Sequence, residues 1–193
     1  RAEYRLLLRQ DNADLRLTEI GHKIGLISDE RYKLFIDKKD KIYKEIERLK
    51  STIVKPTKET NAFLRENNSS EILAGVRMSE LLKRTELNYK LLEKIDINRE
   101  ELPKDIKEEV EIMVKYEGYI KMQEEQVKSF KKLEKKILPD DINYDDVKGI
   151  RIEARQKLNK YKPHSIGQAS RISGVSPADV SVLLVYLEQL KRG

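Results

Sequence analysis

Two long stretches of this chain repeat apolar residues every three or four positions, which is the spacing of one face of an α-helix. The first runs over residues 28–53 and the second over residues 104–137. Glycine (8) and proline (5) are sparse among the 193 residues, and few segments alternate apolar and polar residues as a strand does. We therefore expect an all-α fold, a helical bundle of two subdomains that contains two long helices.

Residues that begin or stop helices mark both long stretches. Ser28 is a predicted N-cap with Asp29 in the first turn behind it, and Pro56 is expected to end that helix. Pro103 precedes the second long helix and Pro139 closes it. Each helix is predicted to bury one apolar stripe, formed by Tyr32, Phe35, Ile42, Ile46, Leu49 and Ile53 in the first and by Ile106, Val110, Met113, Tyr116, Ile120, Val127, Phe130, Leu133 and Ile137 in the second.

Shorter helices are expected between and after the two long ones. Residues 57–67 predict one helix, and residues 79–95 predict one or two, with Ser79 as a cap. A further helix is expected near residues 150–159, after a loop rich in aspartate. These segments would pack on the apolar stripes of the long helices.

We place the boundary between the subdomains at residues 97–102. Residues 1–100 then form a helical subdomain with an arginine-rich opening, and residues 101–193 form a C-terminal helical bundle. The chain opens on Arg1 rather than on a methionine, so we expect it to be a piece of a longer protein.

Composition argues against several classes of functional site. The chain has no cysteine, which excludes thiolate metal sites and cysteine nucleophiles, and its two histidines, His22 and His164, lie far apart in the sequence. No glycine-rich phosphate loop or nucleophile motif is present, so we expect no catalytic, cofactor or metal site here. No apolar run approaches the length of a membrane span, so we expect no membrane partner. The net charge of +6 weakly favours a polyanionic partner.

The stretch SIGQASRISGVSPADVSVLLVYLEQL, near the end of the chain, has the pattern of a DNA-binding helix-turn-helix. Ser165 and Gln168 form a predicted capping box, and Gly174 fits the left-handed position that follows a helix. Ser176 is the predicted cap of the second helix, and Asp179 completes a second box. The sequence therefore predicts a hairpin of two helices with a tight turn.

The second helix of this hairpin lacks the residues that read DNA. Its first turns carry no Arg, Lys, Asn or Gln for contacts with base edges, and Asp179 would repel phosphate. Apolar residues surround most of the helix between residues 180 and 190, which predicts burial on several sides. We expect a packing or docking hairpin. The alternative is a DNA-binding regulator with a coiled-coil dimerisation helix over residues 28–53, and a purely structural scaffold is a third hypothesis.

The opening sequence RAEYRLLLRQDNADLRL has an unusual density of arginine. If it is helical, Arg1, Arg5 and Arg9 stack on one face, where their guanidinium groups suit phosphate oxygens. The alternative is that nearby acids neutralise these arginines within the fold, with the three leucines of the stretch in the core. Residue spacing leaves the two interpretations equal. The lysine-rich residues 128–139 are more typical of a solvated helix face than of an RNA contact.

Two stretches together resemble one family. The opening RAEYRLLLRQDNADLRLTEIGHKIGL, and EGYIKMQ with the hairpin SIGQASRISGVSPADVSVLLVYL, are similar to the C-terminal part of the glucose-inhibited division protein A family (GidA/MnmG). The resemblance implies a tRNA uridine 5-carboxymethylaminomethyl modification enzyme that is cytoplasmic, contains FAD and works as a homodimer with a partner GTPase. It also implies that the flavin site belongs to a preceding domain, so that this part alone is not an enzyme.

Individual residues match the motifs of that family. The resemblance implies that the arginines of the opening motif bind tRNA, namely Arg1, Arg5, Arg9 and Arg16. It implies that residues around EGYIKMQ and in the hairpin belong to the bundle that docks the GTPase, namely Tyr116, Gly118, Tyr119, Gln168, Arg171, Gly174 and Leu183. Some of these would contact the partner and others would shape the bundle.

Overall fold

The computed structural model describes residues 4–97 and 99–190. The chain divides into two compact units, residues 1–123 and residues 124–193. The division falls inside helix α6 (Lys104–Glu134), so the boundary expected at residues 97–102 is wrong. The reason is that Leu102, Ile106 and Val110 pack into the core of the first unit and hold the start of α6 there.

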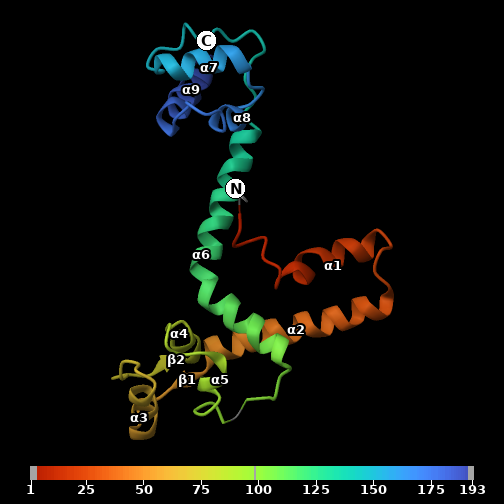
Figure 1. Ribbon diagram of the computed structural model, residues 1–193, viewed down its shortest axis with the longest axis vertical. Helices are drawn as coiled ribbons and strands as arrows, with labels where there is room; N and C mark the ends of the chain where they lie inside the picture. Colours follow the sequence, from red (N-terminus) through yellow and green to blue (C-terminus); the bar gives the residue numbers. More distant parts are fainter. Residues whose placement is uncertain (1–3, 98, 191–193) are drawn as a thin grey trace. The chain divides into compact units, whose positions relative to one another are not determined.

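Unit 1 begins with a pair of helices and continues with short elements, shown from red to green in Figure 1. Its elements before α6 are α1 (Ala13–Lys23), α2 (Asp29–Ser51), β1 (Ile53–Val54), α3 (Lys58–Glu66), β2 (Val76–Arg77), α4 (Met78–Leu82) and α5 (Tyr89–Leu92). Helices α1 and α2 run antiparallel and pack along each other. The all-α prediction is confirmed, with one small exception: β1 and β2 form an antiparallel ribbon in which Ile53 faces Arg77.

Helix α2 begins where the sequence predicts and ends earlier. The Ser28 hydroxyl accepts a hydrogen bond from the Arg31 N–H, as an N-cap does. The helix stops at Ser51, because Thr52 is extended and its carbonyl accepts from the Met78 N–H of the neighbouring segment. The predicted burial of Ile53 is therefore wrong, since Ile53 lies in β1 and is half exposed.

The core of unit 1 forms where α2 meets the short helices and the start of α6. From α2 it takes Ile42, Ile46 and Leu49, all of which belong to the predicted stripe. These side chains are buried within the unit, so this stripe is not free to pair with a second copy in a coiled coil. Ser79 is also buried inside α4 and is not its cap, because Arg77 occupies the N-cap position.

The predicted apolar stripe of α6 is buried only along its first turns. Ile106, Val110 and Val114 lie in the core of unit 1. Further along the helix, Tyr116 and Phe130 are exposed, which contradicts the prediction of one continuous buried face. Helical spacing shows that these side chains share a face, and it does not show where a packing partner ends.

Unit 2 contains the end of α6 and three helices, drawn in blue shades in Figure 1. They are α7 (Ile152–Tyr161), α8 (Ile166–Ser170) and α9 (Pro177–Leu190). Its core gathers Tyr144, Leu158, Ile166 and Leu183 from the loop and from each of the three helices. Among the described residues, no helix is long and apolar enough to cross a membrane.

Candidate binding surfaces

The arginine-rich opening is not helical. Residues 5–7 and 11–12 are turns and α1 begins only at Ala13, so the predicted stacking of Arg5 and Arg9 on one helix face is wrong. The turns form because side chains satisfy the local backbone: the Arg9 guanidinium donates to the Leu6 carbonyl, and the Asn12 amide donates to the Leu7 carbonyl. Arg1 lies outside the described residues.

Two of the candidate arginines are engaged within the chain. Arg9 pairs with Asp11 at 3.0 Å and lies 3.7 Å from the carboxylate of Glu109 on α6. Arg16 donates to the Asn12 side chain and to the Arg9 carbonyl. Only Arg5 of the described candidates has an exposed side chain. The structure thus favours neutralisation within the fold for Arg9, engages Arg16 through neutral acceptors, and leaves Arg5 accessible.

The contact between the opening segment and α6 buries an acid. Glu109 is 4% exposed, and burial raises its pKa to about 7; the neighbouring Asp11 raises it further and Arg9 opposes the rise. Lys38 of α2 adds a second contact, because it pairs with both Asp14 and Asp105. Charged groups therefore help to hold the opening segment and α1 against α2 and α6.

The EGYIKMQ motif has a structural part that its sequence does not reveal. Glu117 pairs with Lys50 of α2 and with Lys83 after α4, each at 3.1 Å, and so joins three helical segments. Both lysines lower the pKa of this carboxyl group. At the other end of the motif, the Gln123 side chain accepts from the Leu7 N–H and holds the opening segment.

The candidate partner-binding residues of this motif lie at the surface. Tyr116 is 43% exposed and Tyr119 is 62% exposed, with Met122 beside them on the helix at 61%. Gly118 is also exposed, and a Cβ added there would meet nothing within 4 Å. This part of α6 is therefore accessible to a partner, whereas Glu117 and Gln123 are taken up within unit 1.

The turn of the helical hairpin is built as the sequence predicts. The Ser165 hydroxyl accepts from the Gln168 N–H, although the exposed Gln168 side chain accepts from His164 N–H rather than from Ser165. Gly174 has φ +98°, the left-handed conformation expected of it. At the second cap, the Asp179 N–H donates to Ser176 and the Asp179 carboxylate accepts from the Ser176 N–H at 2.8 Å.

Asp179 has a partner that the local pattern did not indicate. The Arg151 guanidinium donates to its carboxylate at 2.8 Å, and the Arg151 N–H donates at 3.2 Å. These contacts, together with Ser176, hold the pKa of Asp179 far below its usual range. The buried carboxylate therefore joins the start of α7 to the start of α9, and it is not offered to any partner.

The second helix of the hairpin packs most of its apolar surface against the core of unit 2. Leu183 and Leu187 lie in the core, and Leu183 has no exposed surface, so it shapes the bundle and does not present its side chain to a partner. Val185 is 58% exposed and Val182 is half-buried. Val182, Leu184 and Tyr186 also pack against this core on either side of Leu183, so the predicted burial on several sides is confirmed in part, while Val185 stays open.

Arg171 lies at the surface of the hairpin. Its guanidinium pairs with Glu134, whose carboxylate also accepts from the Ser165 hydroxyl at 3.1 Å. Gly167 is needed beneath them, because a Cβ there would lie 2.5 Å from the Glu134 side chain. Arg171 is thus positioned by Glu134 and remains half exposed.

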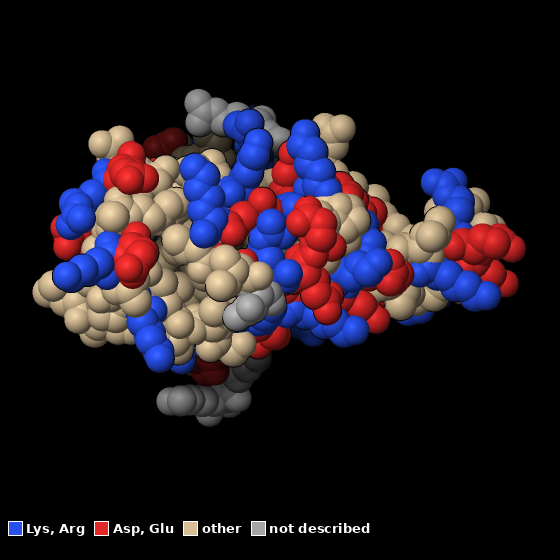
Figure 2. Space-filling model, turned by 90° about the horizontal axis from the view of Figure 1, so that it is seen from below, with Lys and Arg blue, Asp and Glu red and all other residues tan. Residues whose placement is uncertain are grey.

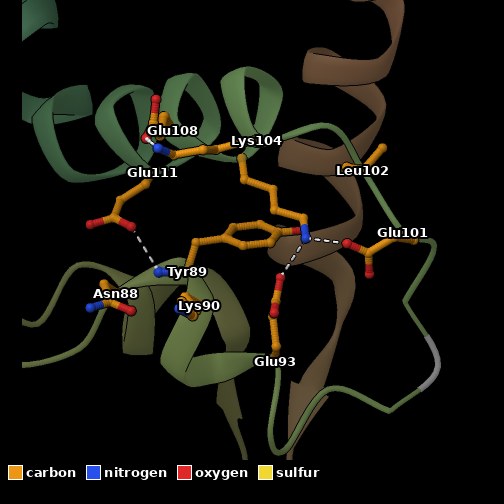
Figure 3. Close-up of a pocket in the computed structure, with 10 residues that line it drawn as sticks. Asn88, Tyr89, Lys90, Glu93, Glu101, Leu102, Lys104, Glu108 and Glu111 are labelled. Carbon is orange, nitrogen blue, oxygen red and sulfur yellow. Dashed lines mark hydrogen bonds and ion pairs between the residues drawn. The ribbon is translucent and has the colours of Figure 1, made fainter.

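Unit 1 contains a hollow of about 540 Å³ that is lined mainly by charged side chains, several of which are labelled in Figure 3. The Tyr89 N–H donates to Glu111 at 2.8 Å, and the unlabelled Lys107 pairs with Glu93 and Glu101. Several of the charged groups are therefore paired with one another in the wall of the hollow. Among the described residues, no group of three or more His, Asp or Glu side chains could hold a metal ion.

Surface charge is mixed over much of the molecule. Figure 2 shows Lys and Arg interspersed with Asp and Glu over the face that it presents. Such a surface provides solubility and gives little direction to a polyanion. A nucleic-acid contact would need a local excess of basic side chains, which the net charge of +6 does not locate.

Comparisons with known proteins match almost the whole chain. Residues 29–124 match the tRNA modifying enzyme MnmG/GidA C-terminal helical domain, and residues 126–193 match the tRNA modifying enzyme MnmG/GidA C-terminal helical bundle. The tRNA uridine 5-carboxymethylaminomethyl modification enzyme MnmG of Caldicellulosiruptor saccharolyticus is 61% identical over 193 residues, covering 100% of this chain and 31% of that protein. The MnmG of Clostridium kluyveri is 58% identical over 192 residues, with the same coverage.

Solved structures agree with the sequence matches. Aquifex aeolicus GidA in its form II crystal has a TM-score of 0.64 and 38% identity, covering 97% of this chain and 29% of that chain. The form I crystal gives a TM-score of 0.62 with the same identity and covers 28% of that chain. The chain spans 31% of the length of the curated relatives it matches. Because the two domain models follow each other along it and the relatives match it from end to end, the chain belongs to the C-terminal helical region of the MnmG/GidA family.

Proposed function

We propose that this chain is the tRNA-binding and GTPase-docking module of an FAD-dependent enzyme that modifies the wobble uridine of tRNA. The observation that carries the proposal is the 61% identity, along the whole chain, with a protein named as a tRNA uridine 5-carboxymethylaminomethyl modification enzyme. In this proposal the parent enzyme is homodimeric, and the reaction takes place in the part of the enzyme that this chain does not span.

The described residues do not fit the FAD of the parent enzyme. A dinucleotide site needs a parallel strand, a glycine-rich turn and a helix that starts at the pyrophosphate. The strands β1 and β2 are two residues long each and pair antiparallel. The proposal therefore assigns FAD to the preceding domain, and gives this chain binding functions only.

The open side of α9 is the surface that best supports GTPase docking. Val185 is 58% exposed on a helix whose first turns carry no basic residue, and Ser181 is exposed on the same helix. Arg171, fixed by Glu134, provides a charged group on the hairpin. An exposed apolar anchor with polar groups around it is the usual composition of such an interface.

A substitution at Val185 tests this surface without damaging the fold. We expect Val185→Asp to abolish co-purification with the pathway's GTPase while circular dichroism stays unchanged. Leu183→Asp is unsuitable, because it places a charge in a fully buried position of the core. Gly174 is also unsuitable, since φ is +98° and an added Cβ would lie 2.6 Å from Glu153. Gln156→Asp, at an exposed position of α7 in the same unit, is the matched control and should keep the GTPase, whereas retention of the GTPase by Val185→Asp would refute this docking surface.

The tRNA part of the proposal has its own test. The chain should bind a labelled tRNA with an affinity that falls steeply as salt rises, because neutralised phosphates release counterions. Arg5 is the opening-motif arginine whose accessible side chain supports such a contact, so Arg5→Ala should weaken binding. A chain that binds no tRNA at any salt concentration would contradict this part.

The DNA-binding alternative loses its structural support. The stripe of α2 that would form the coiled coil lies in the core of unit 1. The acid at the start of α9 is buried and already holds Arg151 and Ser176. A module without ligands, the scaffold hypothesis, would predict that both binding assays fail.

A further inference from the structure

A long segment of unit 2 carries basic residues and no acid. Between Glu153 and Asp179 the sequence has no Asp or Glu, although 34 acids occur in the 193 residues of the chain. The same segment contains Arg155, Lys157, Lys160, Lys162 and Arg171, with His164 among them. A run of residues that carries only positive charge, in a chain of mixed charge, favours a surface that binds a negatively charged partner.

The two arginines of the segment have acidic neighbours from outside it. Arg171 pairs with Glu134, and the Arg155 guanidinium lies 3.9 Å from Asp145. The three lysines differ, because within the described part of the chain no carboxylate pairs with Lys157, Lys160 or Lys162. They cluster in the last turns of α7 and in the residue that follows it.

An exposed aromatic ring lies among these lysines. Tyr161 is 57% exposed at the end of α7, and the Lys160 ammonium lies 5.5 Å from the centre of its ring. His164 is exposed two residues beyond Lys162. We call residues 157–164 the α7–α8 corner. It combines cations with an accessible aromatic face, which is the composition of surfaces that bind single-stranded nucleic acid.

The backbone of the corner is held in a costly conformation. Lys162 has φ +41° and ψ +63°, a left-handed conformation that glycine adopts more easily than lysine. The following residue is Pro163, which is buried and further restricts the residue before it. Basic residues at a helix C-terminus also complement the helix dipole. That effect explains neither the exposed Tyr161 nor a lysine at a position that favours glycine.

We propose that the α7–α8 corner binds the sugar–phosphate backbone of an RNA, with Lys157, Lys160 and Lys162 on phosphates and the Tyr161 ring stacked on one unpaired base. This inference rests on the proposed tRNA-binding function and places a contact in unit 2, apart from the arginines of the opening motif. Phosphates fit the site because lysines act as point charges towards them, and an acidic protein would make no use of the stacking ring.

The role of the three lysines is tested by measuring the affinity of the 193-residue chain for a labelled tRNA, by fluorescence anisotropy, over a series of salt concentrations. A variant with Lys157→Ala, Lys160→Ala and Lys162→Gly should bind roughly tenfold or more weakly, and the slope of log affinity against log salt should shrink by about 2, for three lost phosphate contacts. The matched control, Lys128→Ala with Lys131→Ala and Lys132→Ala, removes the same charge from exposed positions of α6 in the same unit. In this control, the slope of log affinity against log salt should differ from that of the unmodified chain by less than about 0.9, the value of one phosphate contact.

The ring and the strained backbone are tested separately. Tyr161→Ala removes the stacking ring and should weaken binding to unpaired RNA several-fold. Tyr161→Phe keeps the ring and loses only the hydroxyl, so it should bind as the unmodified chain does. Lys162→Gly alone should raise the unfolding temperature and still lower the affinity, which separates binding from folding.

The outcomes distinguish the inference from the proposed function. If the unmodified chain binds tRNA and the corner variant binds equally well with the same salt slope, the corner is not the contact and the module can still bind tRNA elsewhere. If the unmodified chain binds no tRNA, both proposals fail. Equal binding of a poly-glutamate peptide, with no effect of Tyr161→Ala on RNA, would overturn the assignment of RNA as the ligand.

Discussion

Removal of the buried Asp179 carboxylate should destabilise unit 2 more than changes at the exposed polar residues of the hairpin. In Asp179→Ala, the Ser176 N–H, the Ser176 hydroxyl and the Arg151 N–H lose an acceptor that now lies at 2.7 to 3.2 Å. Each such bond contributes about 1 kcal/mol, and the half-exposed Arg151 guanidinium adds little because solvent screens its charge. We therefore expect a loss of about 3 kcal/mol.

Urea unfolding followed by circular dichroism measures this loss, and hydrogen exchange assigns it to unit 2. For a unit of this size, 3 kcal/mol corresponds to a fall in melting temperature of about 15 °C. Ser181→Ala, at an exposed position of the same helix, is the control and should change stability by less than about 0.5 kcal/mol. A loss below about 1 kcal/mol for Asp179→Ala would refute the role of this carboxylate in joining α7 to α9.

The same carboxylate predicts a direction for the pH dependence. Its pKa is depressed in the folded chain, so the unfolded chain binds the proton more tightly and the folded state is favoured when the group is ionised. The stabilisation is fully present above the pKa of an unfolded aspartate, about 3.9, and is lost as the pH falls towards the lower folded value. The difference in stability between the unmodified chain and Asp179→Asn should therefore shrink progressively as the pH falls below about 4.

Three further changes have clear expected results. Leu183→Ala, at a position with no exposed surface, should cost about 2–5 kcal/mol in urea unfolding, and a cost below 1 kcal/mol would contradict its place in the core. Gly118→Ala should raise the stability of unit 1 by about 1 kcal/mol, because the added Cβ meets nothing within 4 Å; a loss would reveal a contact there. The raised pKa of Glu109, about 7, means that the folded state holds this proton more tightly than the unfolded chain, so stability should fall as pH rises from about 4.3 to about 7. Glu109→Gln should remove that fall, and an unchanged pH profile would count against a buried Glu109.

Local sequence signals were enough for most of the helices and for several of their caps, although not for the cap predicted at Ser79. Ser28 and Ser176 cap their helices as predicted, because the hydrogen bonds of a cap close within three residues of the chain. Gly174 adopts its left-handed conformation for the same local reason. The all-α fold followed from the periodicity of the long stretches, since a helical period is incompatible with strands.

The binding surfaces were less predictable, since a sequence motif does not show which of its side chains are exposed. Leu183 belongs to the core, and the exposed apolar residue of that helix is Val185. In the opening motif, Arg9 and Arg16 turned inward to local acceptors. The sequence does carry a signal for the α7–α8 corner, which is the absence of Asp and Glu between Glu153 and Asp179. The basic residues of this run are spaced apart, so they form no basic motif.

The sequence by itself determined where helices begin, where they turn and which residues share a face, because those features depend on neighbours within about four positions. Only the tertiary structure decided which face is covered and which charges are paired. Asp179 meets Arg151 across 28 residues, and Glu117 meets Lys50 and Lys83 from two other segments of the fold. Such pairs are set by how the segments pack together, and no local pattern in the chain specifies that packing.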